Sequence, residues 1–412
     1  MKQEKISGAV AAAVDFGNDA VRVFVAEMLD NGSFRLLGLG EAASDGISEG
    51  RVVDIEKAVA ALQNALKEAE IMSRCKINSA WAAVAGEHIS GRNAAGSTVL
   101  GDSSGVSVSD IKKVKQMACA EVAQQSGRRV IAVLERDYEL DGHTGVQKPL
   151  GMTGHKLSGE MHLVLASANA LADWEKCLLQ CGVETEEQFV FSGLAAARAV
   201  LSEDEKQLGV CVADIGASTT DAAVFYRGAV EETFSLALAS GDIHRDIAEM
   251  HHASLESAER AKRTIGLSGD DGEFVSLLEA GGGGESKQSL AVVRDTIAYR
   301  VEEILDAIRE KIVRDDKRLA AGIVLVGDGA LLPGIAEAAK AKLNMPARIG
   351  MPLYRGPNHE RVASPRFAAG MGLLEKGAAM RGENAAAGGG FFQTVKNWMR
   401  RVWEGGAPEQ EQ

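Results

Sequence analysis

Short runs of apolar residues recur along the chain, and two of them end in an aspartate followed, two positions later, by a glycine. In residues 210–225, VCVADIGASTTDAAVF, two apolar runs flank the segment DIGAST. This pattern predicts a strand, a glycine-containing turn and a second strand. Amides of such a turn can surround a phosphate, and Asp214 can hold a hydrated magnesium ion beside it. An ordinary buried hairpin explains this one segment equally well.

The same arrangement occurs near the N-terminus. Residues 9–26, AVAAAVDFGNDAVRVFVA, contain an apolar run, an aspartate, an apolar residue, a glycine, a short turn and a second apolar run. Asp15 takes the place of Asp214, and Gly17 takes the place of Gly216. The repetition predicts two similar lobes that face each other, with the two aspartates on opposite sides of one cleft.

A third loop joins a predicted buried strand to a predicted helix. In residues 323–334, IVLVGDGALLPG, the strand runs into Gly327-Asp328-Gly329, where backbone can approach a nucleotide closely. A single Gly-x-Gly is weak support for such a site. Three loops of phosphate-binding type in this order are far more specific.

The spacing of apolar residues predicts the elements between these loops. Residues 34–40 and 79–85 are predicted strands, and 54–70 is a predicted helix with one apolar stripe, formed by Ala58, Leu62, Ala65, Leu66 and Ala69. Further helices are predicted over 109–125, 168–181, 190–201, 290–313 and 363–380, with a helix-rich segment over 242–266. Residues 269–286, which include four consecutive glycines, are predicted to be a flexible loop.

Composition narrows the class of protein. A chain of 412 residues predicts two or more domains, and its net charge of −13 argues against a general nucleic-acid surface. The five cysteines have no ligand-type spacing with histidine, which indicates reduced thiols. With no signal peptide and no apolar run of about 18 residues, we expect a cytoplasmic protein.

The C-terminal segment has a different character. Residues 381–390 end in three glycines and predict a flexible linker, whereas 391–404, FFQTVKNWMRRVWE, predict an amphipathic helix. Its apolar face comprises Phe391, Phe392, Val395, Trp398, Met399, Val402 and Trp403, and its polar face carries Lys396, Arg400 and Arg401. A helix that packs on a protein surface is the alternative, but tryptophans flanked by basic residues favour a membrane interface. Residues 405–412 are predicted to be a disordered tail.

The free-energy contributions to lipid binding indicate how tightly such a helix can hold a membrane. Half-burial of its apolar side chains contributes on the order of 7 kcal/mol, and each basic residue near anionic lipid adds about 1 kcal/mol. Ordering the segment costs roughly half of that. One tail therefore binds weakly and reversibly, and a filament that presents many tails gains avidity.

At the three loops the chain resembles the actin-like ATPase superfamily and, more narrowly, the FtsA family of bacterial cell-division proteins. The family patterns are Asp-Ile-Gly-Thr/Ser, Asp-Ile-Gly-Gly-Gly-Thr and Gly-Gly-Gly. Residues 38–70, 148–167, 208–216 and 319–335 resemble further family segments in the same order. The resemblance implies an α/β, two-lobed actin-like (ribonuclease H-like) fold with an inserted small α+β subdomain and a C-terminal amphipathic helix.

The resemblance also implies domain boundaries. Residues 1–85 would form the first-lobe core, 86–167 the inserted subdomain, and 168–380 the second lobe with part of the return to the first lobe. Within the second lobe, an outer subdomain would span about 228–315. The linker at 381–390, the membrane helix at 391–404 and the tail at 405–412 would follow.

ATP and magnesium are the cofactors that the resemblance implies. The matching positions are Asp15, Gly17 and Asn18 in the first loop, Asp214, Gly216, Ala217, Ser218 and Thr219 in the second, Gly327, Asp328 and Gly329 in the third, and Glu259 and Lys262 on a helix near ribose and adenine. Asp15 and Asp214 would hold magnesium through water.

Several of these positions depart from the family pattern. Asn18, Asp19 and Ala20 stand where the family has Thr or Ser and a basic residue, and Asp328 replaces a glycine. Ala217 and Ser218 also replace glycines, and Ser192 stands where relatives carry a water-orienting Glu or Gln. We expect weak, magnesium-dependent ATP binding and at most slow ATP hydrolysis.

The function implied is a tether at the division septum. The protein would polymerise on the cytoplasmic face of the membrane, bind inner membrane lipids, hold the FtsZ C-terminal peptide and recruit later divisome proteins through the inserted subdomain. Arg294, Arg300 and Arg309 are candidates for the peptide site. A small-molecule kinase or a pilus-assembly relative of the same superfamily is the alternative. A kinase needs a general base beside the cleft, and neither alternative needs the amphipathic tail.

Overall fold

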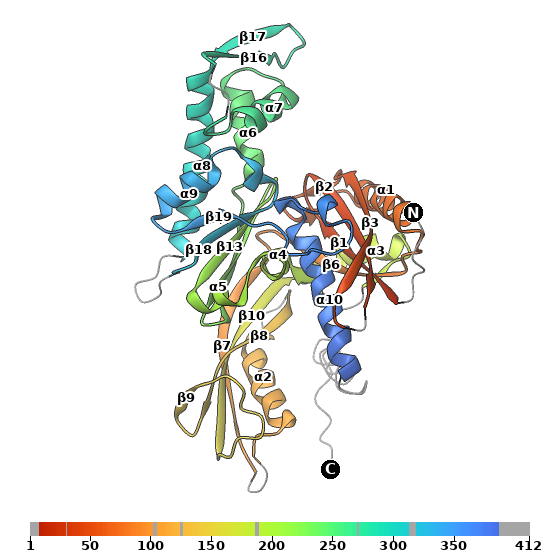
Figure 1. Ribbon diagram of the computed structural model, residues 1–412, viewed down its shortest axis with the longest axis vertical. Coiled ribbons are helices and arrows are strands. Elements are labelled where there is room, and N and C mark those ends of the chain that lie inside the picture. Colours follow the sequence, from red (N-terminus) through yellow and green to blue (C-terminus); the bar gives the residue numbers. More distant parts are fainter. Residues whose placement is uncertain are drawn as a thin grey trace.

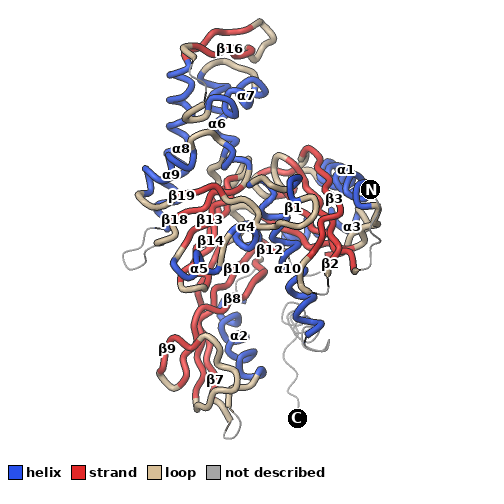
Figure 2. Tube along the Cα trace, viewed as in Figure 1, coloured by secondary structure: helices blue, strands red, loops and turns tan. Residues whose placement is uncertain are grey.

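The computed structural model describes residues 8–29, 31–101, 105–123, 127–185, 189–269, 272–312 and 319–386. Two α/β lobes lie side by side at the centre of an elongated molecule (Figure 1). One subdomain extends upward from the second lobe in this view, and the inserted subdomain extends downward. Figure 2 shows that strands form the centre of both lobes and much of the inserted subdomain. This is the two-lobed α/β fold that the sequence predicts.

The first lobe is built on a sheet with strand order β11-β6-β1-β2-β3, in which β12 also pairs with β6. Its strands are β1 (Ala9–Phe16), β2 (Ala20–Met28), β3 (Phe34–Ala43), β6 (Ser79–Val84), β11 (Glu184–Thr185) and β12 (Val190–Phe191). The short strands β4 (Ile47–Ser48) and β5 (Arg51–Val52) pair with each other. The helix α1 (Ile55–Ser73) buries the whole predicted apolar stripe, which confirms that prediction.

The inserted subdomain is a four-stranded sheet covered by one helix. Its elements are β7 (Ser90–Val99), α2 (Val108–Ala123), β8 (Arg128–Leu140), β9 (His143–Val146) and β10 (Lys156–Ser167), with strand order β7-β10-β8-β9. A reciprocal cap precedes α2: Ser107 Oγ accepts from the Asp110 amide at 3.2 Å, and Asp110 Oδ2 accepts from the Ser107 amide at 3.1 Å. A separate apolar core makes this a distinct unit.

The second lobe carries a sheet of strand order β15-β14-β13-β18-β19. Its strands are β13 (Val210–Ile215), β14 (Thr220–Tyr226), β15 (Ala229–Leu236), β18 (Gly322–Val326) and β19 (Ala347–Ile349). The helices α4 (Ser192–Val200), α5 (Glu203–Leu208) and α9 (Ile335–Leu343) and the 3-10 turn η1 (Asp328–Leu331) lie around it. The chain then returns to the first lobe through the 3-10 turns η2 (His359–Arg361) and η3 (Pro365–Phe367), and α10 (Ala368–Ala386) packs on the first-lobe strands β1, β2 and β6. The two hairpins and the third loop therefore have the predicted local structure.

The outer subdomain contains α6 (Ser240–Met250), α7 (Leu255–Ile265), β16 (Phe274–Leu278), β17 (Glu285–Ser289) and α8 (Leu290–Ile312). The prediction of a flexible loop over 269–286 is wrong for residues 274–278 and 285–286, because β16 and β17 pair as an antiparallel hairpin. The four glycines form its turn, where Gly282 and Gly284 have φ of +72° and +131°. Glycine content indicates a turn as readily as a flexible segment.

The structure moves two predicted boundaries. The helix α3 (Ala168–Gln180) stacks Trp174 on Phe16 of the first lobe, with ring centroids 4.2 Å apart, and β11 and β12 join the first-lobe sheet. The described residues 168–185 and 189–191 therefore lie with the first lobe and not with the second. The helix α10 continues through Ala386, so the first six residues of the predicted linker at 381–390 are helical.

Residues 387–412, which include the predicted membrane helix at 391–404 and the predicted tail at 405–412, lie outside the described residues. Within the described part of the chain, no helix is both long enough and apolar enough to cross a bilayer.

Candidate functional site

The two hairpin turns and the third loop meet at one small cavity. It is lined by both β1–β2 and β13–β14 turns, by Gly327 and Asp328 after β18, and by Ser192 at the start of α4. The cavity measures about 50 Å³. The predicted loops do converge, although Gly329 does not line the cavity and instead lies against Ile215.

Asp15 and Asp214 lie on opposite sides of this cavity, as the paired hairpins predict. Burial raises the pKa of Asp15 to about 6, and the nearby Arg22 guanidinium partly offsets that rise. Burial, with the carboxylates of Asp15 and Asp221 next in importance, raises the pKa of Asp214 well above its usual range. The site is therefore a buried acidic cluster in which carboxylates repel one another.

The remaining loop residues make local hydrogen bonds. Asn18 Oδ1 accepts from the Gly50 amide at 3.2 Å, and the Gly216 amide donates to Thr219 O at 2.9 Å. Thr219 Oγ1 donates to Asp221 at 2.8 Å. Ala217 and Ser218 place side chains at the cavity where the family pattern has glycines.

Asp221 also connects the two lobes. Its Oδ1 accepts from the amide of Gly86, which follows the first-lobe strand β6, at 3.0 Å. Burial raises the pKa of Asp221, although the hydrogen bonds from Gly86 and Thr219 act in the opposite direction. The sequence analysis did not identify this residue as part of the cavity.

A dense set of ion pairs surrounds Arg22 on β2. Its Nη2 lies 2.5 Å from Asp19 Oδ2 and 2.9 Å from Asp328 Oδ2, and its Nε lies 3.3 Å from Glu41 Oε1. Arg366 from η3 lies 3.1 Å from Asp328 Oδ1 and 2.7 Å from Glu41 Oε1. We call Asp19, Arg22, Glu41, Asp328 and Arg366 the cleft network. It is centred on a buried guanidinium, since the Arg22 side chain is 4% exposed.

Sequence reasoning missed both arginines of the cleft network. The register of β1 and β2 pairs Asp15 with Arg22, so strand alternation could have suggested the latter. Nothing local indicates Arg366, because η3 reaches the cavity only where the chain returns from the second lobe to the first.

Glu259 and Lys262 on α7 lie behind the second hairpin. Glu259 pairs with Lys262 at 2.7 Å, and Lys262 Nζ donates to Ser240 O at 3.3 Å. Ser240 Oγ in turn donates to Gly216 O at 2.8 Å. Burial is the largest single influence on the pKa of Glu259 and acts to raise it. The hydrogen bonds from His244, Lys262 and Arg263 together outweigh burial, so the pKa of Glu259 is lowered. Both predicted residues are near the loops, but neither lines the cavity.

The residues around the cavity do not fit a nucleotide triphosphate. Ligand sites for molecules of this size measure about 300–1,000 Å³, far above the 50 Å³ found here. A Cβ on Gly17 would lie 2.9 Å from Asp19 Oδ1, and one on Gly327 would lie 2.4 Å from Asp214 Oδ1. Carboxylates therefore occupy the space beside the glycines through which a phosphate would approach.

A magnesium site with several protein ligands is likewise not found. Among the residues with a described placement, no group of three or more His, Cys, Asp or Glu side chains is arranged to hold a metal. A water-mediated ion at Asp15 and Asp214 stays a prediction.

The three arginines predicted for a peptide site do not form one strip on α8. Arg300 makes two hydrogen bonds to Asp246, at 2.7 and 2.9 Å, and Arg294 donates to Gly269 O at 2.6 Å. Arg309 lies 2.9 Å from Asp306. With 3.6 residues per turn, positions six and nine apart point in different directions. A role of these arginines in binding a peptide stays a prediction.

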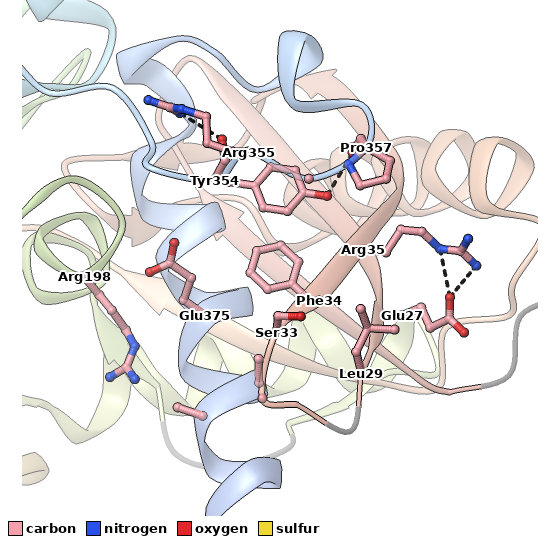
Figure 3. Close-up of a pocket in the computed structure, with 14 residues that line it drawn as sticks. Glu27, Leu29, Ser33, Phe34, Arg35, Arg198, Tyr354, Arg355, Pro357 and Glu375 are labelled. Carbon is pink, nitrogen blue, oxygen red and sulfur yellow. Dashed lines mark hydrogen bonds and ion pairs between the residues drawn. The ribbon is translucent and has the colours of Figure 1, made fainter.

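A larger cavity of about 970 Å³ lies elsewhere, between the β2–β3 turn, residues 354–357 and α10 (Figure 3). The rings of Phe34 and Tyr354 stack there with centroids 4.9 Å apart, and Glu27 pairs with Arg35 at 2.5 Å. Burial raises the pKa of Glu375, at the cavity wall, to about 7. None of the predicted site residues lines this cavity.

The acidic cluster yields a stability prediction. Because the folded-state pKa of Asp214 is raised, the stability that its protonated form contributes is fully present below the ordinary pKa of aspartate and is lost as the pH rises toward the raised value. Asp214→Asn should therefore raise the free energy of unfolding at pH 7.5, by about 1 kcal/mol. The gain should shrink as the pH falls toward 4. Urea unfolding at both pH values, without added magnesium, checks this, and an Asn variant less stable than the parent chain at pH 7.5 contradicts it.

Comparisons with known proteins agree with the architecture. A family model described as cell division protein FtsA matches residues 211–372, and one described as the SHS2 domain inserted in FtsA matches 86–165. The cell division protein FtsA of Neisseria meningitidis serogroup B is 31% identical over 405 residues, covering 94% of this chain and 97% of that protein. FtsA of Pseudomonas aeruginosa is 33% identical and covers 90% of each chain.

Solved structures support the fold. A chain of the PilM-PilN type IV pilus biogenesis complex superposes with a TM-score of 0.62 at 17% identity, covering 89% of this chain and 98% of that chain. The MamK double helical filament gives 0.51 at 16% identity, covering 89% and 98%. At these identities the likeness concerns the fold, which is actin-like with an inserted subdomain.

Proposed function

Because the chain belongs to the FtsA family of cell-division proteins, we propose that it tethers the division ring to the membrane at the septum. In this proposal the protein assembles into filaments on the cytoplasmic face and holds inner membrane lipids through residues 391–404. The outer subdomain binds the FtsZ C-terminal peptide, and the inserted subdomain recruits later divisome proteins. The observation that carries the proposal is the match to full-length FtsA relatives, with the inserted subdomain in its family position.

The cleft supports this function over a small-molecule kinase. Such an enzyme needs room for a substrate beside a nucleotide, and the cavity between the loops measures only about 50 Å³. A pilus-assembly function rests on structural likeness at 17% identity alone. The FtsA relatives are nearly twice as similar in sequence, and they match over most of their length.

Of the three arginines on α8, Arg309 best suits contact with an acidic peptide. Its side chain is 48% exposed and pairs with Asp306 on the same helix, an exposed pair of little energetic value. Arg300 is held by Asp246 and contributes to the structure of the subdomain itself. A peptide surface in this subdomain would therefore use Arg309 without Arg300.

The proposal predicts that the chain carries FtsZ to lipid. FtsZ should sediment with vesicles of anionic phospholipid when the full chain is present, and it should remain in the supernatant with a chain that lacks residues 391–412. An FtsZ without its C-terminal peptide should also stay in the supernatant. If FtsZ sediments equally with the shortened chain, the tether function is contradicted.

A further inference from the structure

We propose that the cleft network closes the cleft between the two lobes in place of a nucleotide, so that the closed arrangement of this chain does not depend on ATP. The inference concerns the cleft alone. It does not rest on the membrane and FtsZ contacts of the proposed function.

The network joins the same structural elements that a phosphate between the loops would join. Asp19, Arg22 and Glu41 come from β1–β2–β3 of the first lobe, whereas Asp328 follows β18 of the second lobe. Arg366 precedes α10 and contacts acids of both lobes, Glu41 at 2.7 Å and Asp328 at 3.1 Å. Separating the lobes would break the Arg22–Asp328 pair and one of these two Arg366 pairs, which would leave charged groups with fewer partners.

Two of the three acids of the network, Asp19 and Asp328, stand at the phosphate-binding positions of the loops. Asp19 lies in the turn of the first hairpin, and Asp328 lies between the two glycines of the third loop. Their carboxylate oxygens accept from the Arg22 guanidinium, with which a phosphate would otherwise pair. The two residues that depart from the family pattern by adding negative charge therefore meet at one arginine.

Charge and space both oppose a phosphate here. Five carboxylates line the cavity, from Asp15, Asp19, Asp214, Asp221 and Asp328, and the two guanidinium groups that line it are already paired with acids. A phosphate would have to displace Asp19 and Asp328 from Arg22 and then lie among the remaining acids. In a buried site that exchange is unfavourable, because like charges at close range repel strongly.

The sequence alone predicted weak binding of ATP, and the ion pairs extend this to exclusion. Isothermal titration calorimetry of the full chain with ATP, with and without magnesium, should show no saturable binding up to about 1 mM. The melting temperature should change by less than about 1 °C when magnesium and ATP are added together. Saturable binding with a dissociation constant below about 0.1 mM overturns the inference.

A variant that opens the network provides the positive arm of the test. Asp19→Ser with Asp328→Gly removes both of these carboxylates, so that Arg22 and Arg366 keep their ion pairs with Glu41 and can in addition meet a phosphate. This variant should gain affinity for ATP at least about tenfold over the parent chain. Asp45→Ser is the control, because Asp45 forms an exposed pair with Lys57 outside the cavity. It removes a negative charge from the same lobe and should not raise the affinity for ATP.

A folded double variant that still does not bind ATP shows that the network is not what excludes the nucleotide, and so overturns the inference. If the double variant does not fold, Asp19→Asn, which keeps the shape of the side chain, replaces it and should show a smaller gain. Sedimentation with anionic vesicles, measured in parallel, should be the same for all these chains. Loss of that signal in the parent chain would contradict the proposed function without touching the cleft.

Discussion

Replacing Arg22 with methionine is expected to lower the free energy of unfolding by about 3–5 kcal/mol at pH 7.5, the cost of removing one partner from a buried ion pair. Methionine retains most of the apolar stem of arginine, so lost packing contributes little. The loss arises because Asp19 and Asp328, which are partly buried, lose the guanidinium that lies 2.5 and 2.9 Å away.

The loss in the free energy of unfolding should depend on pH. The acids around Arg22 determine whether this loss grows or shrinks as the pH rises. Asp15 already has a pKa of about 6 in the folded protein, which the Arg22 charge lowers from a still higher value. Removing that charge raises the folded-state pKa further, so the stability of the variant falls more steeply as pH rises from 5 to 8. The difference in the free energy of unfolding between Arg22→Met and the parent chain should therefore be smaller at pH 5 than at pH 8.

Urea unfolding followed by circular dichroism at the two pH values measures this effect. Lys57→Met provides the control, because Lys57 and Asp45 form an exposed pair 3.7 Å apart whose loss should change the stability by less than about 1 kcal/mol. Equal stability of Arg22→Met and the parent chain at pH 7.5 would mean that the cleft network contributes nothing to the closed form.

The contrast between Asp214 and Arg366 shows how far the sequence predicts this site. Asp214 lies between two apolar runs in a pattern that occurs twice, so its place at a strand end and opposite Asp15 follows from periodicity and repetition alone. Arg366 lies in a segment without periodicity, and it reaches the cleft because the chain crosses between lobes before α10. Long-range ion pairs of this kind leave no local signal in a sequence.

The same distinction explains the errors in the outer subdomain and in the lobe boundary. The apolar spacing of α8 predicts its length correctly, because burial of Val293, Ile297 and Ile304 sets a helical period. The hairpin of β16 and β17 is short and largely exposed, so it lacks the alternation that marks a strand. The strands β11 and β12 have two residues each, and only the three-dimensional arrangement shows which sheet they join.

Replacing Trp403 with glutamate is expected to abolish binding to anionic vesicles. The sequence of residues 391–404 predicts that Trp403 lies on the lipid-facing side, where its loss removes about 1–3 kcal/mol of burial and the new charge adds a penalty of similar size. Gln393→Glu is the matched control, because it also adds one negative charge but on the polar face. The control should weaken binding by only about 1 kcal/mol.

Sedimentation with vesicles at low and high salt measures both variants, and the parent chain should bind less well at high salt. Removal of residues 391–412 should have the same effect as Trp403→Glu, and in both cases the circular dichroism spectrum of the folded chain should be retained. Equal sedimentation of the shortened and full chains would contradict membrane binding by the tail and favour a helix that docks on a partner.

The structure adds a geometric constraint to this prediction. The helix α10 is held in the core through buried Met371, Leu373 and Leu374, and it continues to Ala386. Residues 387–390, Ala-Gly-Gly-Gly, are then all that separates it from Phe391, so the Cα atoms of Ala386 and Phe391 are at most about 18 Å apart in a fully extended chain. If the tail enters lipid at Phe391, the end of α10 must therefore lie close to the membrane surface. Inserting a long Gly-Ser segment after residue 390 should leave vesicle binding intact but allow the end of α10 to move away from the membrane. Fluorescence quenching between a label near the end of α10 and the lipid headgroups would detect the larger distance.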